Sequence, residues 1–265
     1  SASLKIALKN FRESYIFFSH NKEKYPVDYL ETIFALSDSY NRNKKLDSAT
    51  IFNRLGYKES FILKNKKMSI YFTLNEGVNQ YHSGNYKIAK DSLKKSIRQL
   101  KLNEDLANLS IAHYYLGETL YKLDFKENAV KEFIKVDSIV QKISEVMPET
   151  RKGYETLINF YKQQNDKTNQ LKYIERLIKI DSIINTNYRY LSKNIVQNYD
   201  TPKLIADKES IIKSLEKEKK SSKKTSIIVS LLCLILLIFL YLNYKKKKIY
   251  KKRFLKLYHE NQISS

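Results

Sequence analysis

Two stretches of this chain repeat each other: residues 69–97, SIYFTLNEGVNQYHSGNYKIAKDSLKKSI, and residues 108–136, NLSIAHYYLGETLYKLDFKENAVKEFIKV. A shift of 40 residues places Gly77 on Gly117. The same step relates alanines and tyrosines along the chain: Ala49, Ala89 and Ala129, and Tyr81, Tyr121 and Tyr161. Because self-similarity at periods of about 20–50 residues is typical of stacked supersecondary units, the sequence predicts a repeat protein.

The spacing inside each unit indicates a helical hairpin. Gly77 and Ala89 are 12 residues apart, as are Ser37 and Ala49 in the unit before them. Two antiparallel helices approach closely where both side chains are small, so each pair marks a predicted crossing point. Gly84 can adopt the left-handed conformation that ends a helix. The last unit, around residues 156–184, lacks the small pair, and we expect about four extra residues at its turn.

Composition supports an all-α fold. Only 5 Gly and 3 Pro occur in 265 residues, too few for the many turns of an all-β or α/β protein. The one cysteine, Cys233, excludes an intramolecular disulfide.

Residues 225–244, TSIIVSLLCLILLIFLYLNY, contain no charged side chain. About 20 such residues cross a bilayer as a helix, so a single transmembrane helix is predicted. The alternative, a buried core helix, seldom runs this long without a polar stripe. Residues 203–265 carry +11 of the net charge of +21, which favours a membrane surface over nucleic acid as the anionic partner. The predicted membrane-surface residues are Lys245, Lys246, Lys247, Lys248, Lys251, Lys252 and Arg253.

Charge at the two ends of this stretch gives the expected orientation. Eight Lys and Arg residues follow it and seven precede it, and those that follow lie closer to its end. Cytoplasmic flanks carry the excess of Lys and Arg, so we expect a single-pass membrane protein with a cytoplasmic tail and the repeat domain on the opposite side of the membrane. The expected organisation is 1–26 as the end of a preceding repeat, 27–202 as about four hairpins, 203–224 as a juxtamembrane stalk helix, 225–244 as the transmembrane helix and 245–265 as a basic linker.

The hairpin pattern resembles the tetratricopeptide repeat. Gly77, Gly84, Tyr86, Ala89 and Leu93 match its small, turn and aromatic or leucine positions. In the next unit Asp124 replaces the turn glycine, and the aromatic that normally precedes the first glycine by four residues is Thr73 or His113. The period also exceeds the family's usual 34, which implies longer helices. The resemblance implies a helical-hairpin solenoid.

A narrower resemblance covers most of the chain. The block 174–212, which leads into the apolar stretch, and ALSDSYNRNKKLDSA at 35–49 are similar to the sensor region of membrane-anchored AraC-type helix-turn-helix transcriptional regulators of the Bacteroidetes group. That resemblance implies a periplasmic sensor, anchored in the inner (cytoplasmic) membrane by a single helix with a cytoplasmic tail. Its DNA-binding domain would follow Ser265, so that DNA is a partner only through a domain missing from this chain. An input module of a sensor histidine kinase and a membrane-tethered scaffold remain alternatives.

Repeat solenoids bind partners on the concave face formed by the first helix of each hairpin. The repeat's usual inward positions correspond here to a tyrosine-rich groove that would take a peptide or protein ligand. Tyrosine buries area and keeps a hydroxyl group available for recognition. The alternative is that Tyr81 and Tyr121 fill the hairpin interior and that Glu118 and Lys122 form a surface pair. The predicted groove residues are Tyr71, Leu74, Val78, Tyr81, His82, Ile111, Tyr114, Glu118, Tyr121 and Lys122.

Enzyme chemistry is not expected. His20, His82, His113 and His259 are scattered singly, and no phosphate-binding loop, metal-ligand spacing or nucleophile beside a base appears. We therefore expect no catalytic residue, no metal and no cofactor. Besides the peptide or protein ligand, the expected partners are the lipid bilayer and a second copy of the chain.

Overall fold

The computed structural model describes residues 2–143, 145–187 and 201–263, and no strand occurs in these ranges. The prediction of an all-α chain is confirmed. Two compact units are present, Ser1–Ile205 and Ala206–Ser265. Residues 188–200, which the sequence assigns to the repeat domain, lie outside the described part of the chain.

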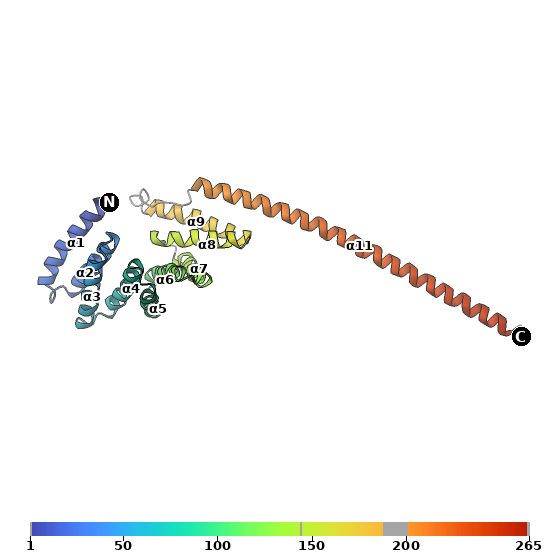
Figure 1. The fold of residues 1–265 in the computed structure, drawn as a ribbon, viewed down its shortest axis with the longest axis horizontal. Coiled ribbons are helices and arrows are strands. Elements are labelled where there is room, and N and C mark those ends of the chain that lie inside the picture. Colours follow the sequence, from blue (N-terminus) through green and yellow to red (C-terminus); the bar gives the residue numbers. More distant parts are fainter. Residues whose placement is uncertain (1, 144, 188–200, 264–265) are drawn as a thin grey trace. The chain divides into compact units, whose positions relative to one another are not determined.

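The first unit is a series of helical hairpins that follow one another in chain order (Figure 1). In each hairpin the two helices pack together, and the first helices of neighbouring hairpins also touch one another. The helices are α1 Ala2–His20, α2 Pro26–Arg42, α3 Leu46–Ile62, α4 Lys66–His82, α5 Tyr86–Leu102, α6 Leu106–Lys122, α7 Lys126–Ile143, η1 Pro148–Thr150 (a 3₁₀ turn), α8 Arg151–Gln163 and α9 Lys167–Asn187.

Identical turns explain the period. Helices α2 to α6 each contain 17 residues, and a three-residue turn joins each to the next, so the repeat of 40 consists of two equal halves. The middle residue of each turn is left-handed: Lys44, Lys64, Gly84, Glu104 and Asp124, with φ between 52° and 81°. The N–H of the next residue then donates to a carbonyl five residues back, as Asn85 does to Gln80 at 2.9 Å. This is the Schellman ending of a helix, with Asp124 in the place of Gly84.

The fourth hairpin differs from the prediction in one respect. Its turn, residues 164–166, has the usual three residues, with Asn165 left-handed at φ 55°. The expected lengthening of this turn is therefore wrong, and the longer connection is the one between α7 and α8, whose described residues 145–150 include η1. The small pair is indeed lost, because the equivalent positions are the buried Ile158 and Gln170.

Glycines mark the close approaches between helices. A Cβ atom on Gly77 would lie 2.6 Å from Cγ of Leu93, and one on Gly117 would lie 2.6 Å from the Phe133 ring. Both contacts join the two helices of one hairpin. The spacing predicted this close approach opposite Ala89 and Ala129, and the side chains in contact are those four residues further along, Leu93 and Phe133. Gly56 receives the Phe72 ring in the same way, but between successive hairpins. Leu93 and Phe133 thus pack the two helices of a hairpin together, and Phe72 packs one hairpin against the next.

Gly84→Ala should destabilise the repeat unit by about 1 kcal/mol, because an L-residue is strained in the left-handed region. No atom lies within 4 Å of the added Cβ, so backbone conformation is the sole cause of the effect. Urea unfolding followed by far-UV circular dichroism would measure it. Lys64→Gly, at φ 52°, is the matched control and should change stability in the opposite direction. Equal signs for the two variants would contradict this explanation.

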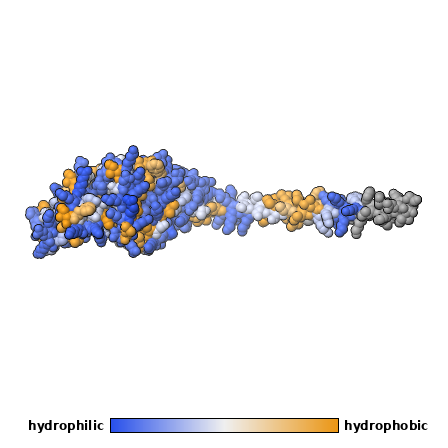
Figure 2. Space-filling model, turned by 90° about the horizontal axis from the view of Figure 1, so that it is seen from below, coloured by the Kyte–Doolittle hydropathy of each residue, from blue (hydrophilic) through white to orange (hydrophobic). Residues whose placement is uncertain are grey.

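The second unit consists of helix α11, Thr201–Ile263, from Ala206 onward. One helical segment, Lys203–Lys248, is long and apolar enough by composition to cross a membrane, and none of its apolar window is buried. Figure 2 shows this apolar part as a hydrophobic band bounded on both sides by hydrophilic residues. The expected stalk, the span and the basic linker as far as Ile263 thus belong to one continuous helix.

Candidate functional site: a groove across the first helices

A groove of about 160 Å³ lies across the first helices of three successive hairpins and the 3₁₀ turn. Apolar side chains and charged groups share its lining. The residues that line this concave groove are Phe34, Asp38, Arg42, Leu74, Asn75, Val78, Asn108, Ile111, Tyr115 and Glu149.

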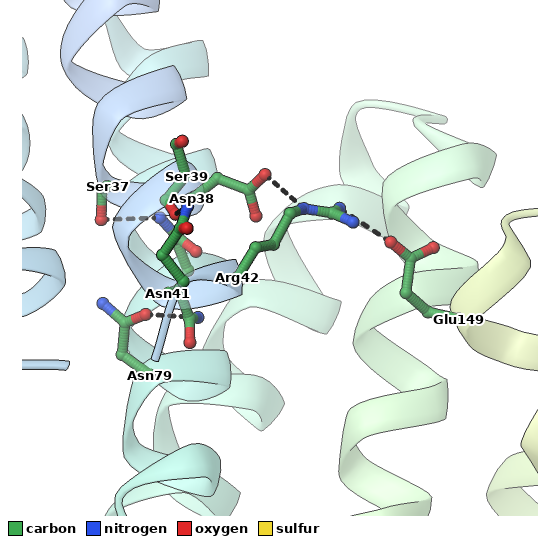
Figure 3. Close-up of polar contacts among 9 residues, drawn as sticks. Ser37, Asp38, Ser39, Asn41, Arg42, Asn79 and Glu149 are labelled. Carbon is green, nitrogen blue, oxygen red and sulfur yellow. Dashed lines mark hydrogen bonds and ion pairs between the residues drawn. The ribbon is translucent and has the colours of Figure 1, made fainter. Parts of the chain in front are cut away.

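Arg42 joins the two ends of the concave groove. Its Nε donates to Asp38 Oδ2 at 2.7 Å, and its Nη2 donates to Glu149 Oε1 at 2.7 Å (Figure 3). Asp38 and Arg42 come from α2, whereas Glu149 belongs to η1, 107 residues further along the chain. The Arg42 side chain is 52% exposed. The bond to Glu149 is therefore open to water and to competition by a charged ligand.

Buried amide and hydroxyl groups fix the register of α2 on α4. Asn41 Nδ2 donates to Asn79 Oδ1 at 2.6 Å (Figure 3). Asn75 Nδ2 donates to Ser37 Oγ at 3.0 Å. Ser37 in turn donates to the carbonyl of Ala49 on α3, at 2.9 Å. Both side-chain pairs span 38 residues, so a slip of either helix would break both. Such a network favours one arrangement of the hairpins over others.

Glu118 is the second polar junction of this face. Its side chain is buried, and Oε2 accepts from the Tyr81 hydroxyl at 3.0 Å and from Lys152 Nζ at 2.8 Å. These three residues join α4, α6 and α8. Burial, followed by the neighbouring Glu118 charge, raises the pKa of Tyr81 far above its usual value, so the hydroxyl stays a donor.

The predicted tyrosines occupy different environments. The Tyr71 hydroxyl donates to Asp105 Oδ2 at 2.7 Å, and burial together with this bond raises the pKa of Tyr71 to about 12. Tyr114 is buried, with its ring 6.1 Å from the Phe133 ring, so it packs inside its hairpin. Tyr121 is 45% exposed at the end of α6.

Other predicted residues lie in the groove or beside it. Leu74, Val78 and Ile111 line the concave groove directly. His82 packs its ring against Tyr115 at 5.7 Å between centroids. Burial and the nearby Arg42 charge lower the pKa of His82, so its ring is neutral at neutral pH. Lys122 is exposed and does not line the concave groove.

Four residues that line the concave groove were not predicted from the sequence: Tyr115, Asp38, Arg42 and Glu149. Tyr115 follows Ile111 by four residues, and Arg42 follows Asp38 by four, which is the spacing of one helix face. Extending that stripe from Ile111 would have selected Tyr115 rather than Tyr114. Nothing in the sequence connects Arg42 to Glu149.

The predicted membrane-surface residues follow the apolar part of α11. Lys245, Lys246, Lys247, Lys248 and Lys251 are exposed on this helix. Lys252 and Arg253 belong to the same helix, and their side chains lie outside the described set. In the part of the chain that the structure describes, no group of three or more His, Cys, Asp or Glu residues could hold a metal ion.

Comparison with known proteins supports the fold. No protein-family model and no curated protein matches the chain. Among solved structures, the crystal structure of BtubC (BKLC) from P. vanneervenii is similar, with a TM-score of 0.58 and 13% sequence identity over 84% of this chain and 88% of that one. At this identity the likeness shows a shared helical architecture and nothing about function.

Proposed function

We propose that this chain is the sensor and membrane-anchor part of a transmembrane transcriptional regulator. The hairpin unit binds a peptide or protein partner in the concave groove, and α11 anchors it in the inner membrane. The repeat unit is periplasmic, the lysine cluster after the apolar segment is cytoplasmic, and the DNA-binding domain lies beyond this chain.

The concave groove is the observation that carries the proposal. It offers apolar contacts through Leu74, Val78 and Ile111 and a reversible ionic bond between Arg42 and Glu149. A polypeptide with a charged side chain can replace one partner of that bond, while its apolar neighbours fill the groove. Separation of Arg42 from Glu149 would loosen α2 from η1, which gives binding a route to a changed hairpin packing.

Site-specific photo-crosslinking in cells tests binding, and alkaline phosphatase fusions test topology. A photoreactive residue at Ile111, in the concave groove, should crosslink to a discrete polypeptide. The same residue at Ile88, which is exposed on α5, should not. Alkaline phosphatase fused after Pro202 should be active, and the same enzyme fused after Arg253 should be inactive.

Each readout can contradict a separate part of the proposal. Equal crosslinking from both positions would remove the concave groove as the binding site. The reverse phosphatase pattern would place the repeat unit in the cytoplasm and exclude the periplasmic sensor.

A further inference from the structure

A second cavity, of about 310 Å³, lies on the other side of the hairpins, where the second helices α3 and α5 flank α4. We call it the outer pocket. Since one water occupies about 30 Å³ of liquid, this volume equals about ten waters and fits an amino acid or a dipeptide. The residues that line it are Asn53, Arg54, Tyr57, Phe72, Thr73, Glu76, Ser92 and Lys95.

Two small residues leave the outer pocket open. Forty residues earlier, Thr73 and Ser92 correspond to Ile33 and Phe52, which pack in one apolar cluster. Forty residues later they correspond to His113 and Glu132, whose side chains bond at 2.6 Å between Nδ1 and Oε2. Both neighbouring repeats thus fill the positions of Thr73 and Ser92 with larger side chains.

A buried acceptor in the outer pocket lacks a partner. Asn53 is 2% exposed, and its Nδ2 donates to the carbonyl of Phe72 at 3.1 Å and to Glu76 Oε2 at 3.0 Å. Two acceptors on the nitrogen fix the orientation of the amide, and Asn53 Oδ1 receives no hydrogen bond. Asn53 Oδ1 is closed to solvent, so neighbouring side chains must shift for the N–H of a ligand to reach it; the hydrogen bond would then recover the free energy that a buried oxygen without a donor costs.

The charges of the outer pocket favour an anion. Arg54 is exposed and forms no ion pair among the described residues. Lys95 Nζ lies 5.7 Å from the centre of the Tyr57 ring. Glu76 is the one carboxylate, and its oxygens already accept from Asn53 and from Gln80 Nε2 at 2.8 Å. Two cations beside one occupied carboxylate attract a negatively charged group.

We propose that the outer pocket binds an apolar α-amino acid group with a free carboxylate, either as a free amino acid or as the last residue of a peptide. The carboxylate meets Arg54 and Lys95, the α-nitrogen donates to Asn53 Oδ1, and the apolar side chain lies against Phe72 and Tyr57. This site is independent of the concave groove.

Calorimetric titration of the full chain in lipid nanodiscs tests the proposal. The probes are L-phenylalanine, N-acetyl-L-phenylalanine and N-acetyl-L-phenylalaninamide, which lacks the carboxylate. We expect saturable binding of at least one carboxylate probe and roughly tenfold weaker binding of the amide. Preference for the acetylated acid identifies a peptide end as the source, and preference for the free amino acid identifies a metabolite. Binding of none of them, or equal binding of the amide, overturns the proposal.

Variants locate the binding site. Thr73→Ile with Ser92→Phe, the side chains of the preceding repeat, should fill the outer pocket and abolish binding. Arg54→Gln alters an exposed residue and so keeps the fold, and it should weaken binding roughly tenfold. Lys94→Gln, an exposed lysine that does not line the outer pocket, is the matched control and should bind as the parent does. Unchanged affinity in Arg54→Gln overturns the proposal, whether or not the filled variant folds.

Discussion

Arg151→Met should lower the free energy of unfolding of the C-terminal hairpin by about 3–5 kcal/mol. Arg151 is buried on α8, and its Nε donates to Asp181 Oδ1 at 2.6 Å while Nη1 donates to Glu155. Burial alone would lower the pKa of Arg151, but the hydrogen bonds to Asp181 and Glu155 and the charges of these two carboxylates together outweigh burial and raise it. Methionine removes the positive charge from between two buried carboxylates, which then repel each other in a region of low dielectric constant.

Arg42→Met is the matched control. Arg42 also bridges two carboxylates, Asp38 and Glu149, but its side chain is 52% exposed against 4% for Arg151. Exposed ion pairs contribute about 0–1 kcal/mol, so this variant should unfold almost as the parent does.

Hydrogen exchange would show where the loss of stability occurs. A repeat protein is stabilised by neighbour contacts, so Arg151→Met should deprotect α8 and α9 and leave α2 to α5 protected. Similar losses of stability in the Arg42 and Arg151 variants would contradict the role given to burial.

The hairpins could be predicted because they depend on local features that repeat. Gly77 and Gly117 mark close helix contacts, and Gly84 marks a left-handed turn, so spacing alone located them. The equal 20-residue halves leave little trace in the sequence, because Lys44, Lys64 and Glu104 occupy the same left-handed position without being glycine. Residues other than glycine, asparagine and aspartate carry little information about such turns.

The groove could be predicted only in part, because it depends on how successive hairpins are placed. Leu74 and Val78 followed from the helix face, but Tyr114 and Tyr115 are adjacent and a small rotation decides which one is buried. The longer connection between α7 and α8 contains Glu149, which bonds to Arg42, and no local sequence pattern encodes a contact across 107 residues.

The difference in burial between Tyr114 and Tyr121 decides which tyrosine substitution can test ligand binding. Replacing Tyr114 by Ser would remove a buried aromatic side chain and cost roughly 3–5 kcal/mol, so loss of signalling there would report unfolding. Tyr121 is 45% exposed, and its replacement carries no such risk.

The effect of Gly117→Ala on the free energy of unfolding should change sign with the residue at position 133. In the parent chain the added Cβ would lie 2.6 Å from Cε1 and 2.9 Å from Cδ1 of Phe133, a buried ring that also faces Gly153 of α8. Because the ring is enclosed between α6 and α8, we expect Gly117→Ala alone to destabilise by about 1–3 kcal/mol. Phe133→Ala alone should cost about 3–5 kcal/mol, since it leaves a cavity at the junction of the third and fourth hairpins.

In the Phe133→Ala background the clash is absent. The methyl group added by Gly117→Ala then fills part of the cavity. Replacing a glycine inside a helix by alanine also stabilises the helix by about 1 kcal/mol. We therefore expect Gly117→Ala to stabilise the Phe133→Ala protein, and the coupling between the two sites to have the sign of relieved overpacking. Urea unfolding of the parent, both single variants and the double variant measures this coupling. Additive effects of the two substitutions would contradict this expectation. They would mean that the Phe133 ring moves freely away from the added methyl group, so that close packing of Phe133 against Gly117 does not hold α6 to α7.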